Sequence, residues 1–415
     1  MKQYKRVRGM HDIMPGETEK WQYAEKIISE TVRLFNYREL RTPVIEEQSL
    51  FERSIGSESD IISKEMYTFQ DKKGRNLALR PEGTASAVRA FIESGLFSAK
   101  NITRLCYYGP MFRYDRPQKG RYRQFYQFGV ELLGGFSPFF DGEVIEILYS
   151  IINNLGIEGC YFGINTLGCR ECREKYTGKI KEYLSSAREA LCEDCKTRIE
   201  NSPLRILDCK NDRCRELTKN IPSIKEVLCT ECTIHFDSVL EYLGKKGIAH
   251  DVQTNLVRGL DYYTRTVFEV YIKGDNNAIA AGGRYDMLVR ELGGEDIPAV
   301  GFAIGMERLL TLMDAKLPVL PAVYLVCMGA EARNACVDIA AGLRKEGIAA
   351  EMDYDDKSLK AALRTADRAR IEWCVILGER ELEKGIILFK NMVTGVQEEI
   401  SSEGCIQRIK ELIKC

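Results

Sequence analysis

Two alternating apolar segments, Ile102–Phe112 and Tyr122–Leu133, flank a short polar stretch in the first third of the chain. Alternation with a period of two is typical of β-strands, so the segments predict the two arms of a long hairpin. The sequence has no GxxxxGK[ST] phosphate loop and no GxGxxG motif between a strand and a helix. Any bound nucleotide is therefore expected to contact side chains of an antiparallel sheet.

The stretch between these strands is strongly basic. Its charged residues are five cations and one acid: Arg113, Arg116, Lys119, Arg121, Arg123 and Asp115. Guanidinium groups match phosphate oxygens two at a time, although a solvated hairpin tip is the simpler reading of a basic run. On the second strand, Gln124, Gln127 and Glu131 interrupt an aromatic run. Polar groups on a largely buried strand need partners, which favours a bound polar ligand.

The overall composition limits the class of protein. A chain of 415 residues predicts two or three domains, and 45% apolar with 29% charged residues is typical of a soluble globular protein. No apolar run is long enough to span a membrane, and the start lacks the apolar core of a signal peptide. Fifteen cysteines in such a chain indicate reduced thiols or metal ligands in the cytosol. The net charge of −1 leaves nucleic-acid binding to local patches.

The pattern along the chain predicts three regions. Helical spacing over 17–36 precedes an expected strand at Leu40–Ile45, whose Pro43 favours an edge position. Other expected elements are a hairpin in MYTFQDKKGRNLALR, helices at 84–97 and 139–155, and strands at 161–165, 250–254, 266–272, 278–281 and 299–304. A charged, helical region holds most of the cysteines between Cys169 and Lys246. After a linker at 316–321, alternating β and α patterns predict a small α/β domain.

Three further segments carry polar residues near strand ends. Leu256–Val270 contains Arg258 and two tyrosines, Ala280–Asp286 contains paired glycines, and Gly301–Leu309 contains Arg308. Glycine permits close backbone approach, and an arginine in the first turn of a helix opposes the helix dipole. An anion or a stacked aromatic ring would explain that arginine. Taken singly, each segment also has an ordinary structural reading as a turn, a core or a surface position.

Together, seven segments resemble the histidyl-tRNA synthetases over nearly the whole chain. They are RGMHDIMPGE, RTPVIEE, LRPEGT, FRYDRPQKGRYRQFYQFGVE, RGLDYYTRTVFEV, AGGRYD and GFAIGMERL. The resemblance implies an α+β class II synthetase with an antiparallel-sheet catalytic domain. Its parts would be a catalytic domain at 1–168 and 247–316, a helical cysteine-rich insertion at 169–246, and an α/β anticodon-binding domain at 322–415.

The resemblance also implies the reaction and the residues that perform it. Histidine would be activated by ATP with Mg²⁺ and then transferred to the 3′ end of histidine tRNA. The implied catalytic residues are Arg258 and Arg113, which would also bind ATP together with Phe125 and Arg308. The implied histidine-binding residues are Glu82, Thr84, Gln127, Glu131, Tyr262 and Tyr263. The implied tRNA contacts are Arg116, Gln118 and Lys119, beside Asp115, where the family often has glutamate. The family is homodimeric, and no membrane partner is expected.

The insertion departs from the family through four close cysteine pairs. They are Cys169/Cys172, Cys192/Cys195, Cys209/Cys214 and Cys229/Cys232. Three have the CxxC spacing of zinc ligands, and eight thiolates suffice for two tetrahedral Zn²⁺ sites. The alternative is eight ordinary reduced thiols, because many members of the family fold this insertion without them.

Two other classes of protein share some of these features. The synthetase-like regulatory subunit of ATP phosphoribosyltransferase binds histidine without catalysis. It typically lacks the C-terminal domain and has lost the arginines of the active site, whereas this chain has Arg113, Arg258, Arg308 and the domain after residue 322. A zinc-bearing nucleic-acid adaptor would account for the cysteines but not for the polar strand. The ligase interpretation accounts for the polar strand, the three arginines and the C-terminal domain.

Overall fold

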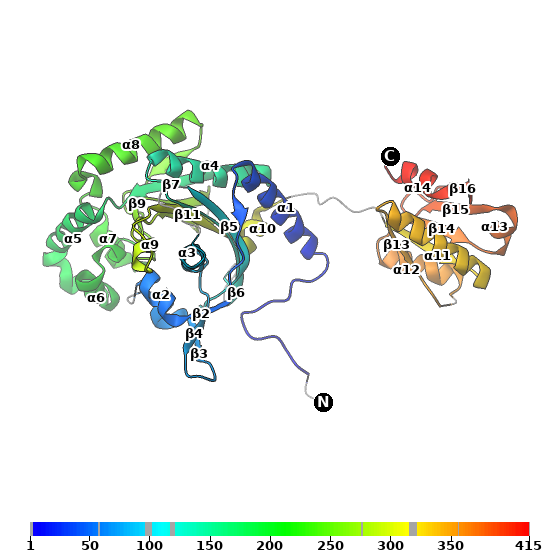
Figure 1. The fold of residues 1–415 in the computed structure, drawn as a ribbon, viewed down its shortest axis with the longest axis horizontal. Coiled ribbons are helices and arrows are strands. Elements are labelled where there is room, and N and C mark those ends of the chain that lie inside the picture. The colour runs from blue at the N-terminus through cyan, green and yellow to red at the C-terminus, as the bar shows by residue number, and fades with distance from the viewer. Residues whose placement is uncertain are drawn as a thin grey trace. The chain divides into compact units, whose positions relative to one another are not determined.

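The computed structural model describes residues 3–56, 59–95, 102–116, 121–274, 277–314, 322–355 and 357–414. The chain divides into two units, Met1–Ala315 and Lys316–Cys415, and each is described by itself (Figure 1). None of the described helices has the length and apolar character needed to span a membrane.

The predicted hairpin is part of an eight-stranded sheet in the first unit. The strands, in spatial order, are β1 (Arg38–Glu39), β5 (Thr103–Phe112), β6 (Gln124–Leu133), β11 (Ala299–Gly305), β10 (Ala280–Arg284), β9 (Thr264–Ile272), β7 (Cys160–Thr166) and β8 (His250–Val252). β5 and β6 pair antiparallel from Thr103 opposite Leu133 to Phe112 opposite Gln124. Only the end strands β1 and β8 pair parallel in the described part of this sheet, so the predicted antiparallel core is confirmed.

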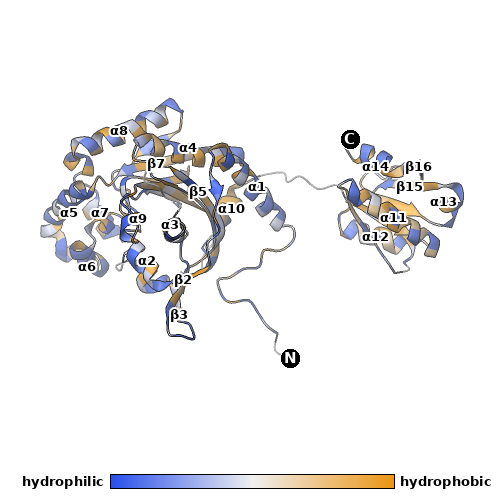
Figure 2. Ribbon diagram, in the orientation of Figure 1, coloured by the Kyte–Doolittle hydropathy of each residue, from blue (hydrophilic) through white to orange (hydrophobic). Residues whose placement is uncertain are grey.

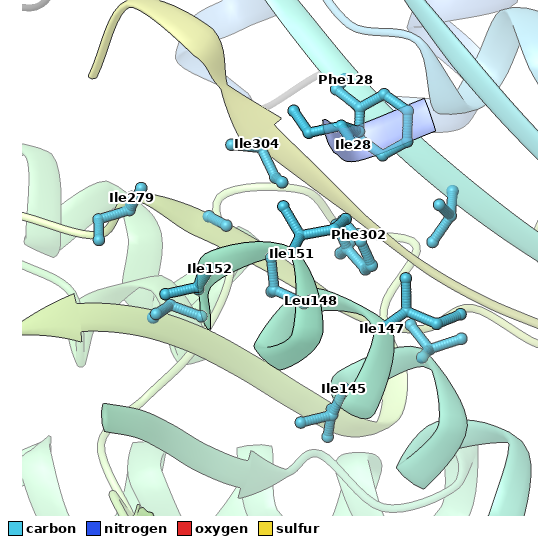
Figure 3. Packing of buried hydrophobic residues seen from close by; sticks show 14 of the residues in the cluster. Ile28, Phe128, Ile145, Ile147, Leu148, Ile151, Ile152, Ile279, Phe302 and Ile304 are labelled. Carbon is cyan, nitrogen blue, oxygen red and sulfur yellow. The ribbon is translucent and has the colours of Figure 1, made fainter. Parts of the chain in front are cut away.

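The sheet has one face covered by helices and one face that carries a polar pocket. The covering helices are α1 (Thr18–Leu34), α4 (Pro138–Asn154) and α8 (Thr230–Lys245). Alternate β6 residues, Phe128 and Val130 among them, pack with Leu148 and Ile151 of α4 in the main core (Figure 3). Because side chains alternate along a strand, the intervening residues of β6 point to the other face, toward α3 (Thr84–Glu93).

The strand expected at Leu40–Ile45 is wrong. The structure has β1 before this segment and β2 (Ile45–Glu47) at its end, with Pro43 outside both strands. The guanidinium of Arg80 explains the interruption, because its Nη1 donates to the carbonyl of Thr42 at 3.1 Å and to the Thr42 hydroxyl at 2.8 Å. Those backbone groups are therefore used by a buried side chain instead of a neighbouring strand.

A small three-stranded sheet follows this segment. It contains the predicted hairpin of β3 (Tyr67–Gln70) and β4 (Asn76–Leu79), with β2 on the other side of β4. Helix α2 (Gln48–Ile55) packs Phe51 and Ile55 against Ala78 and Ala85, which links the small sheet to α3.

The insertion between β7 and β8 is helical, as the sequence predicts. Its elements are α5 (Arg170–Leu184), α6 (Glu193–Asn201), α7 (Asp212–Thr218) and α8, with short 3₁₀ turns at Ser185–Ala190, Pro203–Ile206 and Ile224–Val227. Figure 1 shows these helices gathered beside β7 and β9. Their outer sides are hydrophilic (Figure 2), whereas Tyr176, Ile180 and Ile206 join a core that also includes Val257, which precedes β9.

The second unit is an α/β domain around a five-stranded sheet. The strands, in spatial order, are β13 (Ala349–Met352), β12 (Ala322–Cys327), β14 (Trp373–Leu377), β15 (Ile386–Asn391) and β16 (Gln397–Ser401). Its helices are α11 (Ala330–Lys345), α12 (Leu359–Arg368), α13 (Glu379–Lys384) and α14 (Cys405–Lys414). Separate apolar cores lie on the two faces of this sheet, as expected of an α/β build.

Candidate active site

Glu82 lies just before α3, on the side of the sheet opposite α1 and α4. Its carboxylate accepts hydrogen bonds from the backbone N–H groups of Thr84 at 2.7 Å and Ala85 at 2.8 Å. Both Glu82 and Thr84 are buried. Burial raises the pKa of Glu82, and the two backbone hydrogen bonds oppose that shift. The helix N-terminus thus holds an acidic group inside the pocket.

Glu131 of β6 is the most deeply buried acid of this pocket, with 1% of its surface exposed. Its carboxylate accepts a hydrogen bond from the hydroxyl of Tyr285. Burial raises the pKa of Glu131 to about 8, although the Tyr285 hydrogen bond opposes the shift. Glu131 Oε1 and Gln127 Oε1 are buried and have no hydrogen-bond partner among the described residues. The pocket can therefore accept hydrogen bonds from a polar ligand.

Three tyrosines form the wall of the pocket beside Glu131. The ring centroids of Tyr262 and Tyr263 lie 4.6 Å apart, and the Tyr285 ring lies 5.6 Å from Tyr262 and 6.5 Å from Tyr263. All three are buried. Gly301 on β11 is needed at this place, since a Cβ there would lie 2.0 Å from Glu131 Oε2. The neighbouring strand therefore approaches the acid so closely that only glycine fits at this position of β11.

Two arginines bring positive charge to the other end of the site. Arg113 donates from Nε to the carbonyl of Pro81 at 2.8 Å, and its guanidinium lies 5.4 Å from the centre of the Phe125 ring. Arg258 pairs with Glu269 and lies 5.7 Å from the centre of the Tyr263 ring. Burial lowers the pKa of Arg113, and the charge of Arg258 acts in the same direction. Two cations that repel each other in this way favour an anion between them.

Arg308 lies in the first turn of α10 (Met306–Leu312), where the sequence predicts it. The pairing of Gly305 with Gln127 brings the start of this helix to the polar face of β6. The neighbouring Glu307 accepts a hydrogen bond from the Tyr126 N–H at 2.8 Å, and burial raises its pKa to about 7. Arg308, Gln127 and Phe125 are therefore carried by adjoining elements, and Arg308 is half-buried.

The basic hairpin loop is described only in part. Arg116 is exposed, whereas Gln118 and Lys119, the other two residues predicted to contact tRNA, lie outside the described residues. Asp115 accepts a hydrogen bond from its neighbour's N–H, that of Arg116, at 2.6 Å and an ion pair from Arg121 at 3.2 Å. Asp115, which is one methylene shorter than the glutamate often found in the family, thus pairs with residues of its own loop.

Sequence reasoning missed two tyrosines of this pocket. Tyr285 hydrogen-bonds Glu131, and Tyr107 of β5 is buried with its ring against the backbone of Gly83 and Gly129, whose Cβ atoms would lie within 2.3 Å of the ring. Tyr285 lies in the AGGRYD segment, which drew attention for its glycines. Tyr285 directly follows Arg284, whose side chain faces Asp141. Because neighbouring residues of an extended segment point to opposite sides, this position was the available signal that Tyr285 faces the pocket.

The eight cysteines come together as two groups of four. The first cysteine cluster is Cys169, Cys172, Cys229 and Cys232, and the second cysteine cluster is Cys192, Cys195, Cys209 and Cys214. Within each cluster the sulfur atoms all lie within 4.8 Å of one another. The Sγ–Sγ distances are 3.6 Å for Cys169–Cys172 and 3.8 Å for Cys192–Cys209. Four thiolates bound tetrahedrally to zinc at about 2.3 Å would be separated by about 3.8 Å.

The backbone around both clusters also suits bound thiolates. Cys169, Cys192 and Cys229 each immediately precede a helix. Backbone N–H groups donate to sulfur atoms from Cys169 to Cys232 at 3.1 Å, from Cys229 to Cys172 at 3.1 Å and from Cys192 to Cys214 at 3.2 Å. N–H donors and helix N-termini favour negative charge on sulfur. The donor set, spacing and surroundings fit zinc.

The antiparallel sheet, its helical insertion and the separate α/β unit are the architecture of a class II aminoacyl-tRNA synthetase. Residues 9–309 match the family model described as histidyl-tRNA synthetase, and residues 322–412 match the anticodon binding domain. The chain belongs to the histidyl-tRNA synthetase family. It is an aminoacyl-tRNA ligase that charges tRNA with histidine.

Similarity to known members extends over the full length. A relative from Halothermothrix orenii, named histidine–tRNA ligase, is 46% identical and covers 99% of each chain. One of the same name from Bacillus subtilis is 44% identical over 98% of each chain. The apo histidyl-tRNA synthetase of S. aureus has a TM-score of 0.83 at 34% identity, covering 98% of this chain and 99% of that one.

A structure from Bacillus halodurans is titled as an ATP phosphoribosyltransferase regulatory subunit/histidyl-tRNA synthetase. It has a TM-score of 0.65 at 20% identity and covers 91% of this chain and 98% of that one, which shows the shared fold alone. The much higher identity to full-length ligases favours the catalytic class over the regulatory one.

Proposed function

We propose that the pocket around Glu131 binds the histidine side chain. The observation that carries this proposal is a buried acid beside three tyrosines, with acceptor atoms that have no hydrogen-bond partner among the described residues. An imidazole needs a hydrogen-bond partner at each ring nitrogen, and Glu131 with Tyr263 offers an acceptor and a hydroxyl. Glu82, Thr84 and Gln127 then hold the α-amino group, and Tyr262 closes the pocket. A purely apolar side chain would leave these polar atoms unpaired, so it is rejected.

The arginine end of the site binds ATP in this proposal. Phe125 and Arg308 sandwich the adenine, and Arg308 also reaches the γ-phosphate. Arg113 contacts the α-phosphate and the histidine carboxylate from one side, while Arg258 contacts the α-phosphate from the other. The carboxylate oxygen attacks the α-phosphorus, and the bond to the β-phosphate breaks to release pyrophosphate. Both guanidinium groups neutralise charge as it develops on the phosphorus. Class II synthetases use ATP with Mg²⁺, which supplies charge neutralisation at the β- and γ-phosphates.

The second step transfers histidine to tRNA. The terminal hydroxyl of the tRNA attacks the carbonyl carbon of the adenylate, and AMP leaves. The exposed Arg116 beside Gln118 and Lys119 then contacts the acceptor end of the tRNA, and the second unit binds the anticodon, as its family description suggests. A homodimer and a cytosolic location, both typical of the family, complete this proposal.

Histidine-dependent exchange of labelled pyrophosphate into ATP tests the catalytic proposal. Purified full-length protein should exchange label only when histidine and Mg²⁺ are present, because adenylate formation is reversible. Omission of tRNA should not abolish the exchange. Histidine binding without any exchange would replace the proposal by the non-catalytic regulatory reading.

We also propose that each cysteine cluster binds one structural Zn²⁺. Four sulfur ligands would occupy all four coordination positions of a tetrahedral Zn²⁺ and leave none open for substrate. These ions would therefore not act as Lewis acids in catalysis. Metal analysis of protein purified without chelators should give two zinc ions per chain. Replacement of one cysteine pair, such as C192S/C195S, should leave one. Less than half an equivalent of zinc, with eight freely titratable thiols, would contradict the proposal.

A further inference from the structure

The loop that carries Arg258, Tyr262 and Tyr263 receives its side-chain support largely from the insertion. We name it the RGLDYY loop, residues 258–263. Arg173 donates from Nη1 to the carbonyl of Asp261 at 3.0 Å and to the carbonyl of Tyr263 at 3.2 Å. Arg205 of the insertion donates to the carbonyl of Gly259 at 3.2 Å. Three alternate carbonyls of the loop thus accept charge-assisted hydrogen bonds from insertion arginines.

Arg173 is held in place by the first cysteine cluster. It directly follows Cys172, and its backbone N–H donates to the carbonyl of Cys169 at 2.9 Å, in the first turn of α5. The same turn carries two of the four sulfur atoms of the cluster. An ion bound there would fix the start of α5 and, with it, the base of the Arg173 side chain. Loss of the ion would free that turn to move away from the RGLDYY loop.

A second connection joins the first cysteine cluster to β9, the strand that follows the RGLDYY loop. Arg265, two residues beyond Tyr263, donates to Cys232 Sγ at 3.5 Å and pairs with Glu231 at 2.9 Å. Its backbone N–H donates to the carbonyl of Gly168 at 2.8 Å. Arg265 is buried and has a left-handed φ of 45°. This backbone conformation is unfavourable for a residue other than glycine and persists only where the surrounding contacts hold it. Its positive charge also offsets the negative charge of four thiolates around a divalent ion.

We propose that the insertion sets the shape of the histidine pocket, with Arg173 as the positioning residue and the metal of the first cysteine cluster as its anchor. The inference rests on the proposed zinc sites and goes beyond their structural role. It predicts that histidine recognition, and not only tRNA contact, depends on the insertion. Arg173 contacts the carbonyls of Asp261 and Tyr263, at the end of the loop that carries the two tyrosines. Arg258, which would contact the α-phosphate, lies at the other end of the loop, where Arg205 contacts Gly259. Phe125 and Arg308, which would hold adenine, lie on other elements.

The test uses Arg173→Ala in the full-length protein, with Arg173→Lys and Arg170→Ala for comparison. Arg170 lies on the same helix, its side chain is 79% exposed and pairs with Glu174 on the surface, so it is a matched surface control. Arg173→Ala should raise the histidine KM in pyrophosphate exchange about tenfold, since the carbonyls of Asp261 and Tyr263 lose their guanidinium donor. The ATP KM should stay within about twofold of wild type, and Arg173→Lys should recover part of the loss.

Zinc content and hydrogen exchange separate this inference from the proposals on which it rests. Arg173→Ala should retain two zinc ions and show faster amide exchange in residues 256–264. An unchanged histidine KM, or equal rises in both KM values, would overturn the positioning role. Zinc-free wild-type protein with a normal histidine KM would overturn the metal anchor. Absence of histidine-dependent pyrophosphate exchange in the wild type would instead reject the catalytic proposal, which is a distinct result.

Discussion

The proposed histidine pocket and the cysteine clusters both gather buried and half-buried polar side chains, but the hydrogen bonding of those side chains differs. The pocket leaves Gln127 Oε1 and Glu131 Oε1 unpaired within the described structure, and burial raises the pKa of Glu131. In the clusters, sulfur atoms already accept backbone N–H groups and lie at the separation of a shared ion. A site that exchanges its ligand remains under-satisfied and costs stability, whereas a closed site adds stability.

This comparison predicts opposite effects from substitutions in the two regions. A change in the pocket should reduce catalysis while the fold remains as stable as before or becomes more stable. A change in a cluster should lower stability first and affect catalysis only through what that cluster supports. Each prediction below therefore needs two measurements, one of activity and one of unfolding.

The largest effect is expected at Arg258. Arg258→Ala should lower the histidine-activation rate about 10²- to 10³-fold, because the partner charge grows toward the transition state. Histidine KM should change much less, and the midpoint of thermal unfolding should stay close to wild type. Arg290→Ala, an exposed arginine of the same unit that pairs with Asp296, is the control. Equal losses in rate and binding would mean that Arg258 only holds substrate.

The first cysteine cluster should give the next largest effect. C229S/C232S should lose one zinc ion and lower the midpoint of thermal unfolding by about 5–10 °C. The histidine KM should rise about tenfold as well, because Arg173 and Arg265 lose their anchor. Cys160→Ser, at a free cysteine of β7 outside both clusters, should retain two zinc ions and wild-type kinetics. A double variant with wild-type stability and unchanged zinc content would show that the first cysteine cluster is not a structural zinc site.

The second cysteine cluster should show a weaker link to catalysis. Its connection to the pocket is indirect, through the nearby Arg205 and the Gly259 carbonyl, and it joins a shorter part of the chain. C192S/C195S should lose one zinc ion and reduce tRNA charging about tenfold, while histidine activation stays within about threefold of wild type. Comparison of aminoacylation with pyrophosphate exchange in one preparation measures this. Equal loss of both reactions would show that the two clusters act alike.

The sequence predicts the local features of both regions but not their long-range pairing. Alternation in β6 indicates that Gln127 and Glu131 share a face, since that pattern depends only on neighbouring residues. The CxxC spacing likewise indicates metal ligands. No local pattern tells that Cys172 meets Cys229, 57 residues away, rather than Cys195. The same limit explains why Tyr285 was missed as a partner of Glu131 and why Arg80 disrupts the strand expected around Pro43.

The last prediction concerns the pH dependence of stability and sharpens the pocket side of the comparison. Burial raises the pKa of Glu131 from 4.5 to about 8. Between these values the folded protein holds a proton that the unfolded chain has released, so this contribution to stability is complete at low pH and is lost as pH rises. Glutamine does not titrate. The free energy of unfolding of wild type, relative to Glu131→Gln, should therefore fall by on the order of 3 kcal/mol from pH 5 to pH 8.

Denaturant unfolding at several pH values between 5 and 8 measures this difference. Tyr285→Phe is the matched variant, because it keeps the carboxyl and removes the hydrogen bond that holds the pKa of Glu131 down. It should preserve the pH dependence and extend it to higher pH. Parallel profiles for wild type and Glu131→Gln would place the titration on another group. The buried acid would then not be a source of instability, and the contrast between an under-satisfied pocket and closed cysteine clusters would fail at its central residue.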